Sequence, residues 1–218
     1  MQIIDSLGEN QNNAQAGNLG EVIETSLTHY AAQSFEVDQS PPFGGLVRVR
    51  DRSGRCEIFG AVAQIATGGL DPGRRAVARS GGRPGLADEQ VYQDNPQLSR
   101  LLVTTFEVAT LGWRRVNDNE PERFSYVFPD YPPPLHYSVA LCSDSEIIAF
   151  TAKPLYLRTL LAAPVGPGEE LVAAVLRRGA EARGAQGHGW LVETGRALAR
   201  LLKEDYERLR TILEKCGD

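Results

Sequence analysis

The stretch Gly44-Gly45-Leu46-Val47-Arg48-Val49-Arg50, followed by Glu57-Ile58-Phe59-Gly60-Ala61-Val62-Ala63-Gln64-Ile65, decides the fold that this sequence predicts. Both are short apolar runs that contain Gly, and a segment of turn character, Arg52–Arg55, lies between them. The first run alternates between apolar and charged residues, and the second is mostly apolar, which is typical of two strands joined as a β-hairpin. We therefore expect a hairpin at the centre of a small β-barrel.

Other short apolar runs complete the predicted barrel over residues 19–116. A first strand is expected at Gly20–Thr25, a second at Ser34–Val37 and a last, buried strand at Leu101–Val108. Residues 1–18 are mostly polar and bury too little surface to offset the entropy of ordering, so they are predicted to form a flexible tail.

The sequence changes character after the barrel. Residues 117–134 are predicted to be a Pro-rich linker, because three consecutive prolines at 132–134 favour an extended polyproline conformation. Residues 135–218 are predicted to form a mainly helical domain with helices at Pro154–Ala162 and Pro167–Arg183. One long amphipathic helix is expected over residues 190–215, packed either internally or against a partner helix. The fold class predicted is α+β, a small N-terminal β-barrel followed by a C-terminal helical domain.

Composition limits the classes of function. The chain has 218 residues, a net charge of −5 and a pI near 5.3, so it has no overall attraction to nucleic acid or anionic lipid. No apolar run reaches the roughly 18 residues of a membrane span, and no secretion signal is recognisable at the N-terminus. Three widely spaced cysteines argue against a disulfide framework. These features predict a cytoplasmic protein.

One charge asymmetry stands out against this composition. Residues 48–83 contain only three acidic residues but eight arginines. The arginines are Arg48, Arg50, Arg52, Arg55, Arg74, Arg75, Arg79 and Arg83. They are interpreted either as a solvated hairpin and loop or as an interaction patch for phosphate or an acidic partner surface. The second half of this stretch belongs to a Gly- and Arg-rich loop over residues 67–95, and a loop of that length is typically functional or disordered.

Recognisable catalytic motifs are missing from the sequence. His29, His136 and His188 are isolated from one another and from the cysteines, so no metal site is predicted. There is no G-x-S-x-G nucleophile motif, and acids such as Asp144, Glu146, Glu169 and Glu170 are interpreted as helix-start or loop acids. We therefore expect no cofactor, and we expect that the protein is not an enzyme.

Three segments resemble the HAS-barrel family, which is named for the HerA translocase and the ATP synthase. The segments are Gly20–Glu24, Pro42–Val49 and Phe59–Val62. The resemblance implies a small N-terminal barrel of the kind that forms a crown on ring ATPases, where it holds neighbouring subunits together and does no chemistry. This chain departs from those motors because it lacks the phosphate loop G-x-x-x-x-G-K-[ST]: none of its three lysines follows a glycine.

These features lead to a first hypothesis, a non-catalytic interaction or assembly module that acts as an adaptor to a larger ring complex. Its partner would be a protein, and self-association through barrel edges or the C-terminal helix is compatible with it. A second hypothesis is an accessory factor in DNA processing or repair that binds nucleic acid through the Arg48–Arg83 region. A third is an enzyme with an unrecognised site between the barrel and the helices.

Overall fold

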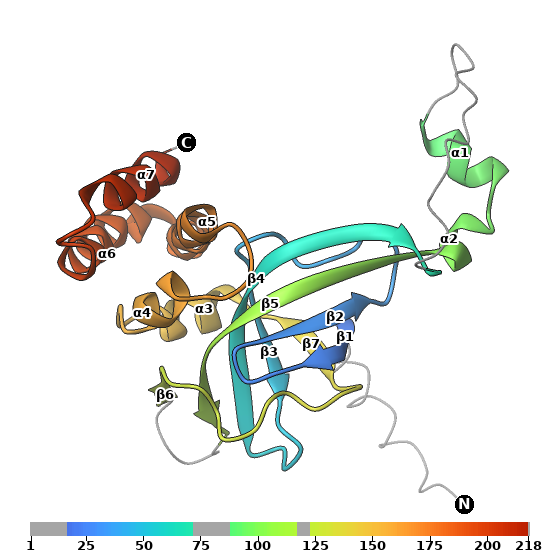
Figure 1. Ribbon diagram of the computed structural model, residues 1–218, viewed down its shortest axis with the longest axis horizontal. Coiled ribbons are helices and arrows are strands. Elements are labelled where there is room, and N and C mark those ends of the chain that lie inside the picture. Colours follow the sequence, from blue (N-terminus) through green and yellow to red (C-terminus); the bar gives the residue numbers. More distant parts are fainter. Residues whose placement is uncertain (1–16, 72–87, 117–122, 218) are drawn as a thin grey trace, which may run out of the picture.

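The computed structural model describes residues 17–71, 88–116 and 123–217 (Figure 1). Its strands are β1 Asn18–Thr25, β2 His29–Ser34, β3 Leu46–Arg50, β4 Cys56–Gly69, β5 Leu102–Arg115, β6 Phe124–Ser125 and β7 Ser138–Leu141. Its helices are α1 Asp88–Asp94, α2 Leu98–Leu101, α3 Asp144–Phe150, α4 Tyr156–Leu161, α5 Gly168–Glu181, α6 Gly187–Leu201 and α7 Tyr206–Cys216, with a 3₁₀ turn, η1, at Gly184–Gln186.

Six antiparallel strands close into a barrel. The order around it is β2-β1-β7-β3-β4-β5, and pairing between β2 and β5 completes the circle, while the two-residue β6 adds to the end of β5. The α+β class predicted from the sequence is confirmed. The strand between β1 and β3 is β7, so a segment from beyond residue 116 completes the barrel.

The first half of strand β4, up to Ala63, is buried on both faces, which explains its continuous apolar run. Phe59, Ala61 and Ala63 pack against the helices. Val62, which points to the opposite face, joins a second cluster inside the barrel that includes Tyr30, Phe106 and Val108 among its members. A strand covered on both faces loses the alternation of polar and apolar residues that a half-exposed strand shows.

The helices α3 to α7 form a layer on one side of the barrel, while α1 and α2 lie apart from them at the far end of β4 and β5 (Figure 1). Phe150 of α3 stacks on Phe59 of β4 with ring centroids 5.2 Å apart. Helix α5 is enclosed by its neighbours, and every residue from Leu171 to Leu176 is buried. Because α4, α6 and α7 all contact it, α5 is the central element of the helical layer.

Two sequence predictions about secondary structure are wrong. The second strand is His29–Ser34, which ends where the predicted strand Ser34–Val37 was expected to begin. The barrel uses Tyr30 and Ala32 as the inward-facing residues of this strand. The single helix expected over residues 190–215 is two helices, α6 and α7, and Asp205 caps the second by accepting a hydrogen bond from the Arg208 amide. The two helices pack on α5 within the chain.

Several other predictions lie partly outside the described residues. The predicted tail at 1–18 does so except for residues 17 and 18, and Asn18 already belongs to β1. Within the predicted loop at 67–95, residues 72–87 are not described, while the first three residues belong to β4 and the last ones include α1. Residues 117–122 of the predicted linker are likewise not described.

Substitution of two glycines with positive φ, Gly44 and Gly54, distinguishes the cost of backbone strain from the cost of overpacking. Gly44 has φ 73°, and a Cβ there would lie 2.5 Å from Cβ of Ala174 on α5, whereas Gly54 has φ 70° and open space around it. We expect Gly54→Ala to lower the free energy of unfolding by about 1 kcal/mol through backbone strain alone. Gly44→Ala should cost about 3 kcal/mol, because overpacking against α5 is added.

Urea unfolding of both variants would measure this difference. Equal losses for Gly44→Ala and Gly54→Ala would show that the loop before β3 does not press on α5 as described.

Candidate functional site

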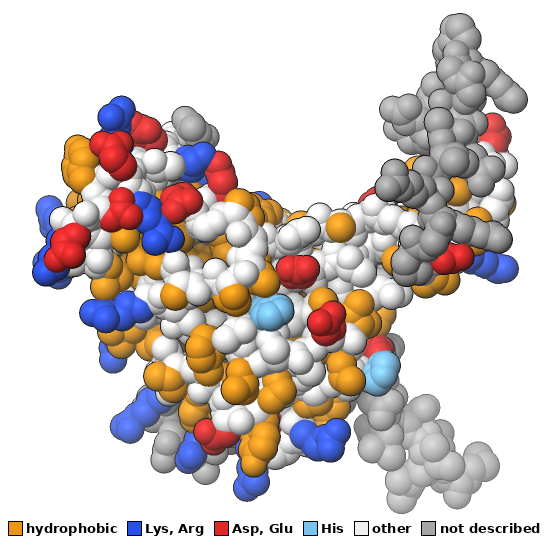
Figure 2. All heavy atoms as spheres, in the orientation of Figure 1, with side chains coloured by type: hydrophobic (Ala, Val, Ile, Leu, Met, Phe, Trp, Pro, Cys, Tyr) orange, Lys and Arg blue, Asp and Glu red, His pale blue; other side chains and the backbone are white. Residues whose placement is uncertain are grey.

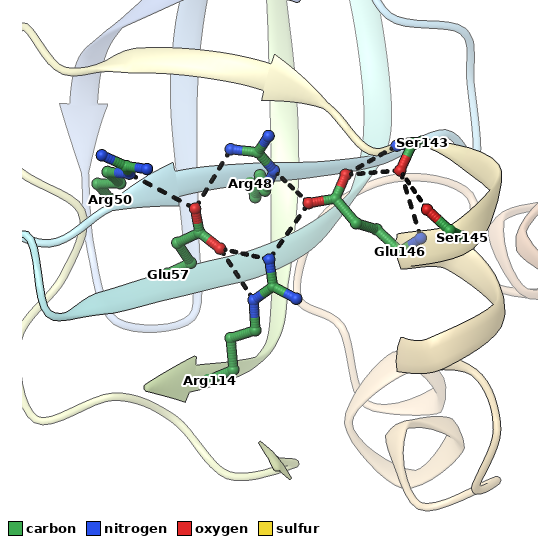
Figure 3. A network of polar contacts seen from close by, with 7 residues as sticks. All are labelled: Arg48, Arg50, Glu57, Arg114, Ser143, Ser145 and Glu146. Carbon is green, nitrogen blue, oxygen red and sulfur yellow. Dashed lines mark hydrogen bonds and ion pairs between the residues drawn. The ribbon is translucent and has the colours of Figure 1, made fainter. Parts of the chain in front are cut away.

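A cluster of charged side chains lies where the barrel meets the helical layer, and we call it the charged cluster (Figure 3): Arg48, Arg50, Glu57, Arg114 and Glu146. Glu57 is its centre, with a side chain only 4% exposed. The strand registers bring the cluster together, since Glu57 on β4 lies directly opposite Arg50 on β3 and Arg114 on β5. Residues opposite one another in neighbouring strands present their side chains on the same face, where opposite charges attract.

Each carboxylate oxygen of Glu57 has an arginine partner. Oε1 lies 3.3 Å from Nη1 of Arg48 and 3.5 Å from Nε of Arg50. Oε2 accepts a hydrogen bond from Nε of Arg114 at 2.9 Å and lies 2.8 Å from Nη2 of the same residue. Two nitrogens of Arg114 therefore share one oxygen of Glu57, while Arg48 and Arg50 share the other.

Glu146 joins the cluster from helix α3. Its Oε1 lies 2.7 Å from Nε of Arg48 and 3.3 Å from Nη2 of Arg114. Its Oε2 accepts hydrogen bonds from the backbone amide and the hydroxyl of Ser143, which completes a capping box at the start of α3. The same side chain thus starts the helix and binds it to the barrel.

Burial determines how much these ion pairs contribute to stability. The guanidinium of Arg114 also lies over the rings of Phe59 and Phe124, 5.3 and 5.7 Å from their centroids. Charges in such partly apolar surroundings are screened less than surface pairs, so removing one partner leaves a costly unpaired charge. The cluster can therefore fix the barrel to the helical layer.

The ionisation of Glu146 reflects this setting. Partial burial alone would raise the pKa of its carboxyl group, but the Ser143 backbone hydrogen bond and the charge of Arg48 outweigh it, with further help from the Ser143 hydroxyl and Arg114. The net result is a pKa below the ordinary value. Glu146 therefore stays charged under mildly acidic conditions.

The structure separates the eight arginines of the predicted interaction patch. Arg48 and Arg50 belong to the charged cluster. Arg52 and Arg55 are exposed on the β3–β4 connection, where Arg55 lines a shallow hollow of about 410 Å³ together with Ser53, Cys56 and Arg115. The remaining four, Arg74, Arg75, Arg79 and Arg83, lie outside the described residues.

Sequence reasoning did not identify Glu57 or Arg114 as members of a site. The hairpin itself carried a usable signal, because a connection centred on Arg52–Arg55 places Arg50 opposite Glu57. Glu146 was interpreted as a helix-start acid, and the structure confirms that role. Its contact with the barrel arises only when α3 packs on β3, a long-range event that no local pattern reports.

A second feature is a two-stranded arm, residues 67–70 and 101–104, where β4 and β5 continue past the pairing of β2 with β5 and lead to α1 and α2 (Figure 1). The loop between β2 and β3 supports one face of this arm. Thr67 donates a hydrogen bond to Oδ1 of Asp38 at 2.9 Å, and the Asp38 amide donates one to the hydroxyl of Thr104 at 2.7 Å. The arm is therefore held in place at its base.

Large apolar side chains are exposed at the end of the arm. Leu70 and Leu101 lie opposite one another, joined by a backbone hydrogen bond of 2.8 Å, and are 58% and 50% exposed. Ile65, further along β4, is 39% exposed. Single exposed apolar residues are common on protein surfaces, but a facing pair on a projecting ribbon offers a compact contact area for a partner.

The described part of the chain offers no metal-binding cluster and no membrane-spanning helix. Within the described ranges, no group of three or more His, Cys, Asp and Glu side chains is arranged to hold a metal ion. In the same part of the chain, no helix is both long and apolar enough to cross a membrane. No known family model matches the sequence, and no curated protein matches it.

Removal of the central carboxylate tests the charged cluster. We expect Glu57→Gln to lower the free energy of unfolding by about 3 kcal/mol, because three arginines lose a buried counter-charge. The control is Glu181→Gln, which breaks the exposed pair with Arg178 on α5 and should cost less than about 1 kcal/mol. Denaturant unfolding of the two variants measures both values, and similar losses would contradict a central role for Glu57.

The lowered pKa of Glu146 predicts a pH dependence. A carboxyl group with a depressed pKa in the folded state stabilises the protein above its ordinary pKa of about 4.3, and this contribution is lost as the pH falls through the folded value. Glu146→Gln should therefore be less stable than the wild type at pH 7, and the gap should narrow below about pH 4.

Thermal unfolding from pH 7 to pH 3 measures that gap. The matched control is Glu193→Gln on the exposed side of α6, which should leave the pH profile unchanged. A gap between Glu146→Gln and the wild type that stays constant with pH would contradict the assignment.

Proposed function

We propose that this protein is a non-catalytic interaction module, an N-terminal barrel of the HerA and ATP synthase type joined to a C-terminal helical domain, and that it acts as an adaptor in a larger complex. The closed antiparallel barrel is compatible with that barrel type, and the resemblance in Gly20–Glu24, Pro42–Val49 and Phe59–Val62 is what suggests it. Fold alone does not carry function, so the proposal depends on a surface that a partner could use.

The observation that carries the proposal is the arm. It places the exposed pair Leu70 and Leu101 at the end of a projecting ribbon. Apolar side chains on a rigid element make effective anchors for a partner, because little conformational entropy is lost on binding. The Asp38 contacts at the base of the arm and the charged cluster at the barrel–helix junction support this rigidity.

The arginines support the proposal less directly. Arg48 and Arg50 lie against Glu57, so part of their charge is already compensated within the chain. Arg52 and Arg55 are exposed on the β3–β4 connection and could add polar contacts at the rim of an interface.

Substitution of the anchors tests the proposal. Tagged full-length protein would be used to isolate partners from the source cell, and the captured proteins would be quantified by mass spectrometry for the wild type and for Leu70→Asp and Leu101→Asp. We expect one or more specific partners, for example a ring bearing a similar barrel, and at least a tenfold loss with either variant.

Leu155→Asp is the matched control, because Leu155 is 56% exposed but lies in the helical layer next to α4. It should capture the partner as well as the wild type does. Absence of any specific partner would overturn the proposal, as would a partner captured equally by the wild type, Leu70→Asp and Leu101→Asp. A partner released by nuclease treatment would favour nucleic acid instead.

A further inference from the structure

We propose that the outer edge of β4, from Ile65 to Gly69, is a site for strand addition, where an extended, uncharged peptide segment of a partner pairs with that edge. This inference rests on the proposed interaction function and specifies how the partner binds. In strand addition, backbone hydrogen bonds provide much of the affinity and alternate side chains provide specificity.

The hydrogen-bond pattern shows which backbone groups face outward. The Leu70 amide donates to the carbonyl of Leu101, which directly precedes β5, and the carbonyl of Ala66 accepts from the hydroxyl of Thr105 on β5. Even-numbered positions of this part of β4 therefore point toward β5. Because strand residues alternate, the N–H and C=O groups of Ile65, Thr67 and Gly69 point away from it.

The outward edge begins where the cover from the rest of the chain ends. At Val62 the opposite edge of β4 is still bonded to the chain before β3, through Gly44 and Gly45. The backbone of Gly166 lies against Ala63, where a Cβ would come within 2.6 Å of the Ala63 carbonyl oxygen. Beyond this point, no described residue forms a backbone hydrogen bond with the outward side of Ile65, Thr67 or Gly69.

This edge lacks the features that normally prevent strand pairing. Proteins protect exposed edges with Lys, Pro, inward charges or bulges. The edge residues Ile65–Gly69 include no charged residue and no proline, and the residues paired with them on β5, Leu102–Phe106, have neither. The nearest acid on β5 is Glu107, which lies opposite Gln64 at the barrel end of this edge. The bulge of β4 lies between Val62 and Gln64, before the free edge begins. The edge is therefore a ready template for another strand.

Shape and charge indicate the occupant. Figure 2 shows the surface indented beside the helices α5–α7, above β4 and β5 in the orientation of Figure 1. A single added strand lies about 5 Å from its neighbour, and six residues span about 20 Å, so one extended segment of that length can pair with the edge from Ile65 to Gly69.

The edge residues themselves, Ile65–Gly69, carry no charge, which favours an uncharged segment. Across the new ladder, Ile65 and Thr67 pair best with β-branched or aromatic residues.

Ile65→Pro tests the inference, because proline removes the outward N–H and places its ring on the edge while leaving the β4–β5 ladder bonds intact. Ile65→Val is the matched control, since it keeps the N–H and the branched side chain. The probe is a library of random octapeptides displayed on phage and selected on the immobilised full-length protein.

Selected peptides should be rich in uncharged β-branched residues, bind Ile65→Val within about twofold of the wild type and bind Ile65→Pro at least tenfold more weakly. Hydrogen exchange at Ile65 and Thr67 should slow when such a peptide is bound.

Two outcomes of the peptide and assembly measurements would overturn strand addition, and a third comes from partner capture. One is the absence of peptides that discriminate between Ile65→Val and Ile65→Pro. The other is a concentration-dependent dimer of the wild type that Ile65→Pro abolishes, which would make a second copy the occupant. Cellular partners that are still captured by Ile65→Pro but lost with Leu70→Asp would remove this inference while leaving the interaction function in place.

Discussion

The contact on which the rest of the structure depends is the pairing of Glu57 with Arg114 and Arg48 at the junction of barrel and helices. Glu57 is nearly inaccessible to solvent, so its charge is compatible with folding only when the arginines of both neighbouring strands are in register. A slip of one residue in either pairing would turn these side chains to the opposite face of the sheet. The cluster therefore favours one strand register over its alternatives, beyond whatever stability it adds.

The same cluster links the two layers through Glu146. This residue caps α3 by its contacts with Ser143 and reaches Arg48 and Arg114 with its other oxygen. Next to it, Phe59 and Phe150 join the barrel to α3 by aromatic stacking. Charge pairing and apolar burial therefore act at the same junction. Together they hold the helical layer against the strands from which the arm extends.

Strand β4 connects this junction to the candidate binding surface. Its first half is covered on both faces, by the helices on one side and the barrel interior on the other. Its second half leaves the barrel, keeps β5 as a partner on one edge and turns the other edge toward solvent. A strand that is buried for half its length and free for the rest holds its exposed backbone groups in a fixed direction, which lowers the entropy lost when a partner binds.

How much the sequence predicts can be seen from particular elements. The strands β3 and β4 and the helix α5 were expected from their local patterns, because alternation, turn residues and a helix start at Pro167 act over a few residues. The boundary of β2 was predicted wrongly, and α6 and α7 were merged into one helix. A short strand and a break between two amphipathic helices depend on packing partners that are distant in sequence.

The sequence by itself therefore determined the α+β class, the central hairpin and the absence of a phosphate loop, all of which follow from short-range patterns. Only the tertiary structure decided that Ser138–Leu141 completes the barrel between β1 and β3, and that Glu146 meets Arg48. It also decided that the outward side of the edge from Ile65 to Gly69 forms no backbone hydrogen bond with any described residue. Each of these depends on segments that are far apart in the chain. Their contacts are set by the closure of the sheet and the packing of the helices on it, which no local stretch of residues encodes.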